Sequence, residues 1–464
     1  MSSVITPARA AQELGRFEGK LIGPDDSDYD EARSLCNAMI DKRPALIARC
    51  ASADDATKAV KFAREHDLAI AIRGGAHNGA GLGSVDDGVV IDLSLLRDVE
   101  VDPEARTVRV GGGCTWAEVD AATNEHGLAT PSGIISTTGV GGLTLGGGLG
   151  HLTRKCGLAI DNLLEAEVVL ANGEQVTASA DENPDLYWAL RGGGGNFGVV
   201  TSFVFRLHEV GTVIAGPTFW PVESGAEVLR AYRDFLPNAP RELNAFFLFG
   251  SVPPAPPFPE ELHLRKVCGV VWCYAGADEE AATAAMAPLL DALPEPLMHG
   301  PAAMPYPAIQ GAFDPVYPAG DQWYWRADFV KDIPDEAIEI HAKFGAAMPT
   351  WKSTMHLYPI NGAAHDVGPA DTAWSYRDAT YGAVFAGVDP DPANVDAIRR
   401  WSIDYQEALH PYSAGGAYVN MMMDEGQERV RASYRDNYDR LAEIKAKYDP
   451  DNAFRVNQNI QPKA

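Results

Sequence analysis

Apolar and polar residues follow two different spacings in the first 210 residues, and together they predict helices alternating with strands. Between Ser52 and His66, small apolar residues recur at the spacing of a helix, behind a Ser/Asp start that caps helices. The apolar run Leu68–Ile72 follows after a turn and is typical of a buried strand. Further strands are predicted at Gly88–Leu93, Val99–Asp102, Thr107–Gly111, Leu164–Leu170 and Gln175–Ala178, and a further helix at Trp116–His126. We therefore expect one α+β unit up to about Val210.

The pattern changes after this point, where prolines punctuate residues 253–259. This segment is predicted to be an exposed loop between two strand-like runs, Phe246–Phe249 and Lys266–Tyr274. Helices are predicted at Glu223–Phe235 and Glu279–Leu293, and more strands at Trp323–Val330, Ser353–Pro359 and Ala383–Val388. We expect a second α+β domain, an antiparallel sheet with helices on one face.

The last part of the chain is again helical in pattern. Between Glu428 and Tyr448 apolar residues recur at helical spacing, and Asp449 and Pro450 end the helix. We therefore divide the chain into residues 1–210, residues 211–414 and a C-terminal segment, residues 415–464.

Composition and charge exclude several classes of function. The 464 residues contain 38 Lys+Arg and 64 Asp+Glu, and a net charge of −26 argues against binding to nucleic acid or to an anionic membrane. No run approaches the ~18 apolar residues of a membrane span, and Met1–Arg9 lacks the apolar core of a signal peptide. The six cysteines show no close spacing, so neither disulfides nor a metal site is indicated. We expect a cytoplasmic protein with free thiols.

Glycine-rich loops contain the residues that indicate a function. The segment Ile72–Gly83 contains five glycines around His77, directly after a predicted strand. Glycines let backbone N–H groups converge on an anionic group such as a pyrophosphate, and an imidazole in such a loop can serve as an anchor. Three further motifs follow at Ser132–Asn162, Asn183–Thr201 and Tyr448–Ile460.

The run Gly139–Gly146 invites a different interpretation, a nicotinamide-binding Rossmann fingerprint. That fingerprint requires a strand immediately before it and a helix that opens within it. Here Pro131 and Gly133 make the preceding residues a poor central strand. We expect instead that the backbone of this run lies flat against an extended cofactor.

Together and in this order, the four motifs resemble the berberine bridge enzyme family, FAD-linked oxidases of the vanillyl-alcohol-oxidase type. The resemblance extends from about Pro44 to Ile460. It implies a PCMH-type FAD-binding fold in the first domain, a substrate-binding second domain, and a C-terminal segment that returns to the flavin. The family's flavin contacts fall on Arg73, Gly74, Gly75, His77, Asn78, Gly83, Thr138, Gly139, Gly141, Gly142, Gly146, Asn162, Val200 and Asn457.

The resemblance also implies how the flavin is attached. His77 stands at the position that bonds the flavin's 8α-methyl carbon. Many members add a second bond from a cysteine, but Ile135 stands at that position here, so we expect a single link, as in the nicotine-catabolising branch. Single attachment favours a small substrate over an oligosaccharide. Thr138 matches a position beside the flavin where small side chains are associated with oxygen access.

Catalytic candidates come from two regions. The resemblance places Tyr418, in an expected strand at Gly415–Asp424, as the base that takes the substrate's proton. A phenol titrates near pH 10, so this role needs a neighbouring group that favours the phenolate. Tyr324 and Arg326 share one face of a predicted strand, and His356 and Tyr358 share another. Arg326 is the candidate cation.

We therefore expect an FAD-dependent oxidase that removes a hydride from an alcohol or amine carbon of a small molecule, with oxygen as the electron acceptor. A dehydrogenase of the same fold with another acceptor remains the alternative. A binding protein with a vestigial site is the third possibility, although it leaves the intact loop from Arg73 to Asn78 unexplained.

Overall fold

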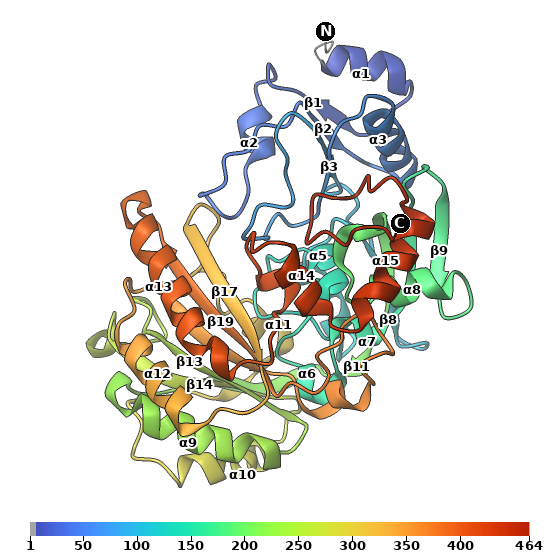
Figure 1. The fold of residues 1–464 in the computed structure, drawn as a ribbon. Helices are drawn as coiled ribbons and strands as arrows, with labels where there is room; N and C mark the ends of the chain where they lie inside the picture. Colours follow the sequence, from blue (N-terminus) through green and yellow to red (C-terminus); the bar gives the residue numbers. More distant parts are fainter. Residues whose placement is uncertain (1–5, 464) are drawn as a thin grey trace.

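Two sheets form the N-terminal part of the protein in the computed structural model, which describes residues 6–463 (Figure 1). Residues 1–5, on which part of the signal-peptide argument rests, lie outside the described residues. The first sheet has the order β1 (Lys20–Ile22), β2 (Leu46–Arg49), β4 (Val89–Asp92), β3 (Ile70–Arg73), and only β1 is antiparallel to its neighbour. Between β2 and β3 runs α3 (Ala53–Glu65), which begins where predicted because the Ser52 hydroxyl accepts the Asp55 N–H at 3.2 Å.

The second sheet is antiparallel throughout. Its order is β5 (Val99–Asp102), β6 (Thr107–Gly111), β10 (Val199–Arg206), β8 (Leu163–Val169), β9 (Gln175–Ser179). The helices of this part are α1 (Pro7–Leu14), α2 (Tyr29–Arg33), α4 (Trp116–Asn124), α5 (Val140–Gly146), α6 (Thr153–Cys156), α7 (Ala159–Asn162) and α8 (Pro184–Leu190). A two-stranded pair, β7 (Leu128–Ala129) with β11 (His208–Glu209), leads into the second domain.

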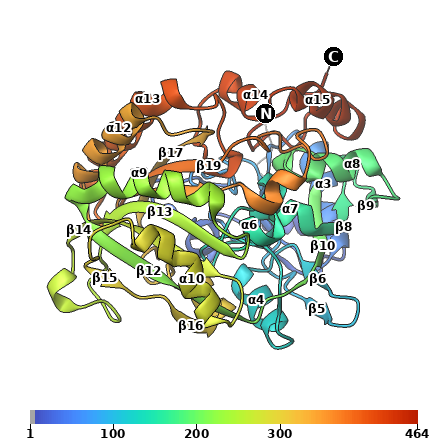
Figure 2. The ribbon, with the colours of Figure 1, turned by 90° about the horizontal axis from the view of Figure 1, so that it is seen from below.

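One large antiparallel sheet forms the second domain. Its order is β15 (Met298–His299), β12 (Thr212–Pro221), β14 (Lys266–Tyr274), β13 (Leu243–Ser251), β18 (Thr354–Pro359), β19 (Tyr381–Asp389), β17 (Gln322–Val330), and β16 (Ala302–Pro305) also pairs with β12. The helices are α9 (Gly225–Phe235), α10 (Glu279–Leu290), α11 (Tyr306–Gln310), α12 (Asp335–Ala346) and α13 (Val395–Leu409). Figure 2 shows α9, α10, α12 and α13 on the side of this sheet away from the first domain.

Side-chain alternation along the strands explains this layering. On β14, Cys268, Val270 and Trp272 belong to the core beneath the helices, whereas Val271 and Cys273 belong to the core shared with the first domain. The sheet is therefore apolar on both faces, with helices on one and the first domain on the other. This arrangement confirms the predicted α+β fold class with an antiparallel sheet and helices on one face.

The C-terminal segment differs from two expectations. The single helix predicted from Glu428 to Tyr448 is wrong, because the chain forms α14 (Gln427–Tyr434) and α15 (Asn437–Tyr448) with a break at Arg435, whose φ is 47°. The Arg435 guanidinium lies 3.4 Å from the centroid of the Tyr376 ring and bonds Asp378 at 2.6 Å, and these tertiary contacts hold the break. The expected strand at Gly415–Asp424 is also wrong, since this stretch makes only a 3-10 turn, η8 (Val419–Met421).

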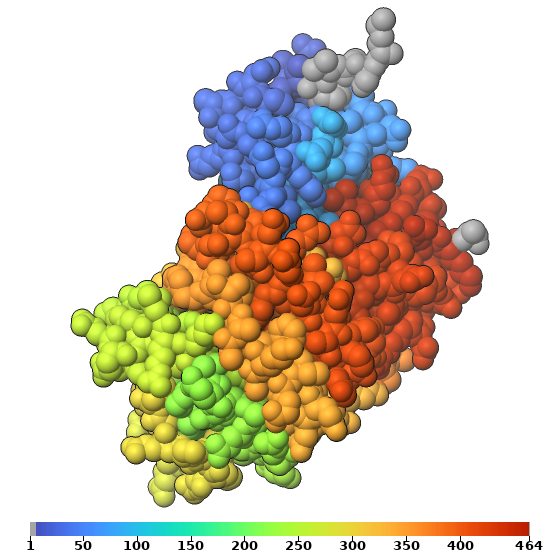
Figure 3. All heavy atoms as spheres, turned by 60° about the vertical axis from the view of Figure 1, so that its left-hand side comes forward, coloured from blue at the N-terminus to red at the C-terminus, as the bar shows by residue number. Residues whose placement is uncertain are grey.

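After α15 the chain returns to the first domain. The buried ammonium of Lys445 donates to the Asn196 carbonyl at 2.6 Å and pairs with Asp449 at 2.6 Å. The side-chain oxygen of Asn196 accepts the Ile460 N–H at 2.9 Å. In Figure 3 the red C-terminal segment lies directly against the blue N-terminal part of the surface. The buried contacts of Asn196 therefore join the end of the chain to the loop before β10.

Other features of the described residues bear on the expectations from composition. All six cysteines are free. No three His, Cys, Asp or Glu side chains within residues 6–463 converge as metal ligands. Over the same range, no helix combines the length and the apolar character needed to cross a membrane.

Candidate active site

A cavity of about 290 Å³ lies between the first domain and the helix-free face of the large sheet. Another cavity, between β17 and α13, holds only about 10 Å³, so the large one is the candidate site. Its first side, which we call the glycine wall, consists of the lining residues within 72–83, 133–145 and 194–200. Its second side, the aromatic wall, consists of Tyr317, Trp323, Trp325 and Tyr358. Residues of the C-terminal segment supply a further part of the lining.

Backbone touches backbone where two loops of the glycine wall meet. A Cβ atom added to Gly75 would lie 2.3 Å from the backbone nitrogen of Gly139, and one added to Gly139 would lie 2.3 Å from the nitrogen of Gly75. Only glycine permits this approach at either position. The loop after β3 and the start of α5 are thereby fixed against each other, which places both beside the cavity.

The run Gly139–Gly146 departs from the expected flat backbone, because Val140–Gly146 forms α5. The helix opens without a preceding central strand, since β7 is two residues long and ends eleven residues before the helix begins. Its glycines allow close packing, as a Cβ on Gly141 would already stand 3.4 Å from the Gly112 carbonyl oxygen. The short helix therefore belongs to the glycine wall and not to a Rossmann unit.

His77 lines the cavity and is half-buried. Its Nε2 atom lies 2.9 Å from the hydroxyl oxygen of Thr137, on the facing loop. Burial lowers the pKa of His77, although Asp314 raises it in part. The imidazole is therefore neutral at physiological pH, which is the form that can act as a nucleophile.

A buried ion pair lies at the start of the loop that carries His77. Arg73 bonds Asp92 on the neighbouring strand at 2.7 Å, and both side chains are almost fully buried. Although burial raises the pKa of Asp92, the adjacent Arg73 guanidinium holds it below its usual value. Further along the loop, the Asn78 side-chain oxygen accepts the Leu82 N–H at 3.1 Å, so Asn78 shapes the turn in addition to lining the cavity.

Two residues that the C-terminal segment contributes to the lining have buried polar atoms without a hydrogen-bond partner in the described part of the chain. The amide nitrogen of Asn457 donates to the carbonyls of Gly195 (3.1 Å) and Phe454 (2.9 Å), but its oxygen is buried without a hydrogen-bond partner among residues 6–463. The hydroxyl of Tyr434, also on the cavity, is buried without a partner as well. Because buried polar atoms are normally paired, both atoms are suited to a polar ligand in the cavity.

Tyr418 reaches the cavity from the C-terminal segment, just before η8. Its hydroxyl oxygen accepts the Gly148 N–H at 3.0 Å and the side-chain N–H of Asn420 at 2.8 Å. Burial raises the pKa of Tyr418 to about 12, and the two donors oppose that rise. The group that favours the phenolate is thus a pair of neutral donors, where the sequence had suggested a cation.

Three other catalytic candidates lie off the cavity. Along β17 the side chains alternate, and Trp323 and Trp325 line the cavity while Tyr324 and Arg326 point to the opposite face. His356 is buried behind the lining, where its Nδ1 atom bonds the hydroxyl of Tyr358. Burial lowers the pKa of His356 to about 3. Tyr324, Arg326 and His356 are therefore not positioned to touch a molecule in the cavity.

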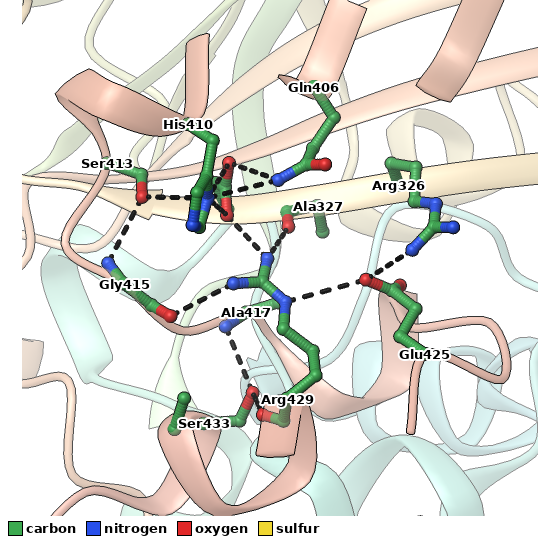
Figure 4. A network of polar contacts seen from close by, with 12 residues as sticks. Arg326, Ala327, Gln406, His410, Ser413, Gly415, Ala417, Glu425, Arg429 and Ser433 are labelled. Atoms are coloured by element: carbon green, nitrogen blue, oxygen red, sulfur yellow. Dashed lines mark hydrogen bonds and ion pairs between the residues drawn. The ribbon is translucent and has the colours of Figure 1, made fainter. Parts of the chain in front are cut away.

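Arg326 instead joins a polar network that we call the clamp: Arg326, Asp328, Glu425 and Arg429 (Figure 4). Arg326 bonds Glu425 at 2.6 Å, and Arg429 bonds Asp328 while its Nε atom lies 3.5 Å from Glu425. Arg429 also donates to the Gly415 carbonyl at 3.0 Å. The clamp ties the outer face of β17 to the stretch of chain that carries Tyr418.

Two of the predicted flavin contacts also lie outside the lining. A Cβ on Gly146 would stand 2.1 Å from the side-chain oxygen of Asn420, so Gly146 makes room for the partner of Tyr418. Asn162 is buried, donates to the carbonyls of Cys156 and Leu158 at 2.9 Å each, and lies 2.6 Å from His208 Nε2. Among the cavity-lining residues are Arg73, Gly74, Gly75, His77, Asn78, Gly83, Thr138, Gly139, Gly141, Gly142, Val200, Asn457 and Tyr418.

Several lining residues were not among the candidates. They are Cys36, Asn37, Asn196, Tyr317, Trp323, Trp325, Asn420 and Tyr434. For β17 a signal existed, since the apolar residues of Gln322–Val330 occupy alternate positions that include Trp323 and Trp325. That alternation predicts an inward aromatic face and an outward face carrying Arg326 and Asp328.

Comparison with known proteins agrees with this geometry. The chain matches the family model of the FAD binding domain over residues 44–179 and that of berberine and berberine-like proteins over residues 417–461. It is 31% identical to an FAD-linked oxidoreductase of Dictyostelium discoideum, with 96% of this chain and 95% of the relative covered. The chain belongs to the berberine bridge enzyme-like family of FAD-linked oxidoreductases.

Within this family, the (R)-6-hydroxynicotine oxidase of Paenarthrobacter nicotinovorans is 30% identical over 96% of this chain and 97% of its own length. The crystal structure of 6-hydroxy-D-nicotine oxidase from Arthrobacter nicotinovorans superposes with a TM-score of 0.86 and 28% identity, covering 98% of this chain and all of that one. The protein is therefore an FAD-linked oxidoreductase with the PCMH-type fold.

The residues present fit an FAD molecule. A Cβ on Gly142 or Gly195 would meet no atom within 4 Å, so these glycines leave space open beside the backbone. The unpaired oxygen of Asn457 and the hydroxyl of Tyr434 are polar groups that a polar ligand would satisfy. The glycine wall, together with Asn457 and Tyr434, is the part of the lining that would hold the cofactor.

Proposed function

We propose that this family member is an oxidase that removes a hydride from an alcohol or amine carbon of a small molecule, with Tyr418 as the proton acceptor. The observation that carries this proposal is the Tyr418 hydroxyl, which lines the cavity and is held by two donors. FAD, when bound, supplies the two-electron acceptor for the hydride. The names of the relatives, oxidases and FAD-linked oxidoreductases, support the reaction class.

The proton step follows from the contacts of Tyr418. The Gly148 N–H and the Asn420 amide stabilise negative charge on the phenol oxygen. They act without a cation, and the pKa of Tyr418 stays at about 12. The active phenolate is then a minor species at neutral pH, so the rate of substrate oxidation should rise with pH well into the alkaline range.

For the cofactor we propose a single covalent bond through His77. The neutral imidazole and its place on the glycine wall support this attachment, and Ile135, which also lines the cavity, has no nucleophile to offer. Acid-denatured protein should keep its yellow colour, and His77→Ala should release FAD on the same treatment. A cysteinyl-flavin peptide, or flavin retained by His77→Ala after denaturation, would contradict the proposal.

We propose oxygen as the acceptor that restores the oxidised cofactor, giving hydrogen peroxide. Thr138 lines the cavity beside the junction of Gly75 and Gly139, and its side chain is small. Thr138→Leu should slow reoxidation by oxygen while sparing anaerobic reduction by substrate. Equal slowing of both half-reactions would assign Thr138 to substrate binding or folding.

The deciding experiment is a screen of alcohols and amines for anaerobic bleaching of the flavin's visible absorbance, followed by a peroxide assay in air. Bleaching with stoichiometric peroxide supports the oxidase. Bleaching without peroxide identifies a dehydrogenase that uses another acceptor. If dithionite bleaches the flavin but no small molecule does, the protein is a binding protein and the proposal fails.

A further inference from the structure

Among the described residues, the imidazole of His77 has one hydrogen-bond partner, the side chain of Thr137. The Thr137 hydroxyl oxygen lies 2.9 Å from Nε2, whereas Nδ1 has no partner in residues 6–463. His77 lines the cavity and Thr137 does not. Because the hydrogen bond at one ring nitrogen decides the role of the other, Nδ1 is the nitrogen that stays open to a ligand.

The two loops that carry this pair are fixed against each other. They are the loops whose backbones meet at Gly75 and Gly139. His77 lies two residues after the first of these glycines, and Thr137 lies two residues before the second. Ala76, directly before His77, has a φ of 59°, a left-handed conformation that residues other than glycine rarely adopt. Such a conformation persists only where the surrounding structure holds it, so the backbone at His77 has a set direction.

The side chain of Thr137 is exposed, yet the residues on both sides of it are held in place. The Ser136 carbonyl accepts the Ala117 N–H at 2.8 Å, and the Thr138 carbonyl accepts the Trp116 N–H at 3.0 Å. Both donors lie in the first turn of α4, where N–H groups have no partner within the helix. The turn that presents the Thr137 hydroxyl to the imidazole is thereby fixed to the start of α4.

A carboxylate of the second domain is bonded to the same turn. Asp314 follows α11, and its two oxygens accept the Ser136 N–H at 3.0 Å and the Ser136 hydroxyl. Burial lowers the pKa of His77, and the negative charge of Asp314 acts against that shift. No Asp or Glu of residues 6–463 lines the cavity, so this charge reaches the imidazole from behind the lining.

Covalent attachment of a cofactor makes two demands on an imidazole. The attacking nitrogen needs a free lone pair, so the proton of the neutral ring must sit on the other nitrogen. As the attacking nitrogen bonds to carbon, the ring becomes positively charged. A hydrogen bond from a charged donor is about twice as strong as a neutral one. An acceptor at the protonated nitrogen and a nearby carboxylate therefore both favour the reaction.

We propose that Thr137 and Asp314 are positioning residues for the attachment of FAD to His77. Thr137 accepts the Nε2 proton and leaves Nδ1 to form the bond, and Asp314 holds the turn and stabilises the ring as it becomes positive. This inference rests on the proposed single bond through His77. In the overall balance, a C–H bond of the 8α-methyl group and the N–H bond of the imidazole break, and one N–C bond forms. Oxygen takes up the two electrons and two protons as hydrogen peroxide.

The test is the rate at which full-length protein, expressed in a riboflavin-starved host, attaches added FAD in air. Flavin absorbance that stays with acid-precipitated protein measures attachment, and absorbance that stays with native protein on gel filtration measures binding. Thr137→Val keeps the shape of the side chain and removes the acceptor. We expect attachment to be slower by about tenfold or more, at an unchanged affinity for FAD. A purely structural role would lower affinity and rate together.

Three further variants complete the series. Thr137→Ser restores the hydroxyl and should restore the rate. Asp314→Asn keeps an acceptor for the Ser136 N–H but removes the charge, and should slow attachment about tenfold. Thr144→Val is the matched control, because the Thr144 hydroxyl is buried in α5 without a partner in the described part of the chain and does not line the cavity. It should attach FAD at the wild-type rate.

The linked nitrogen gives a second readout that needs no variant. The histidyl-flavin peptide of wild-type protein, analysed by NMR, should carry the flavin on Nδ1, because Nε2 is bonded to Thr137. A link through Nε2 overturns the inference, and so does wild-type attachment in Thr137→Val or a parallel loss of affinity and rate. These outcomes leave the proposed covalent bond standing. Release of all FAD from acid-treated wild-type protein removes that bond and the inference with it.

Discussion

The glycine wall presents bare backbone to the cavity at its ten lining glycines, whereas the aromatic wall presents large side chains. At the junction of Gly75 and Gly139 there is no room for a single added carbon. On β17, by contrast, large indoles fill the space and their backbone is paired with β19. The glycine wall therefore depends on residues that lack a side chain, and the aromatic wall depends on the side chains of its residues.

We therefore expect the two walls to tolerate amino-acid substitution to different degrees. A wall of backbone atoms can recognise a cofactor that never varies, but almost any substitution disturbs it. A wall of side chains can change its specificity by exchange of rings without altering the strands beneath. We expect substitutions in the aromatic wall to change substrate specificity, and substitutions in the glycine wall to impair cofactor binding.

The largest expected effect is loss of the cofactor from Gly75→Ala. The new Cβ would lie 2.3 Å from the Gly139 nitrogen, where only backbone can yield, so the two loops must separate. We expect flavin-free protein, measured by the ratio of visible to ultraviolet absorbance, and a stability loss of about 3 kcal/mol or more. Gly311→Ala is the control, because Gly311 lies outside the cavity lining and its Cβ would make only ordinary contacts of 3.5 Å or more. Full flavin content in Gly75→Ala would show that the junction is dispensable.

The second effect concerns Tyr418, which belongs to neither wall. Tyr418→Phe removes the proton acceptor and keeps the ring, so anaerobic reduction of the flavin should slow by about 100- to 10,000-fold. The stability loss should be about 1–3 kcal/mol, because the buried Gly148 N–H loses its acceptor. Stopped-flow absorbance measures the rate. A loss below about tenfold with an unchanged flavin spectrum would remove Tyr418 from the role of base.

The clamp behind the aromatic wall is tested by Arg429→Met. This change removes the guanidinium that Asp328 and Glu425 share, while Arg326 still pairs with Glu425 and Gln406 still donates to Asp328. We therefore expect a cost of about 3 kcal/mol in the free energy of unfolding. KM should also rise, because the clamp links β17 to the stretch that carries Tyr418. Arg431→Met, two residues along α14, removes a surface pair with Asp439 and an exposed contact with the Tyr438 ring, and should cost about 1 kcal/mol or less. Similar urea unfolding curves for the two variants would refute the clamp.

The smallest effect is a displaced pH profile in Asn420→Leu. The Asn420 donor lowers the pKa of Tyr418, so its removal raises that pKa further and reduces the phenolate fraction at any pH below it. Reduction should be about 10- to 100-fold slower at neutral pH. The deficit should shrink at the alkaline end of the profile, where wild-type protein approaches its plateau. A uniform deficit at every pH would mean that Asn420 acts on packing alone.

The two walls also differ in how far the sequence predicts them. Glycine-rich composition marked the loops around His77 and Gly139 as unusual, and the family resemblance assigned their residues to the flavin site. The aromatic wall depends on which alternate side chains of β17 face the cavity. Tyr324 and Arg326 were chosen as candidates for their chemistry, although the alternation of apolar residues indicated that Trp323 and Trp325 face inward. Local pattern could not predict the break at Arg435, because it is held by Tyr376 and Asp378, nearly 60 residues earlier.

The return of the C-terminal segment has a consequence for how the protein is made. A ribosome delivers the loop of His77 first, then the second domain, and only afterwards Tyr434 and Asn457, which supply the unpaired polar atoms of the cavity. A nascent chain therefore has an open cleft where the finished protein has a closed one. With Tyr434 and Asn457 as proposed flavin contacts, we expect stable capture of FAD to follow the synthesis of Asn457, which would make cofactor loading a late step in the maturation of this flavoprotein.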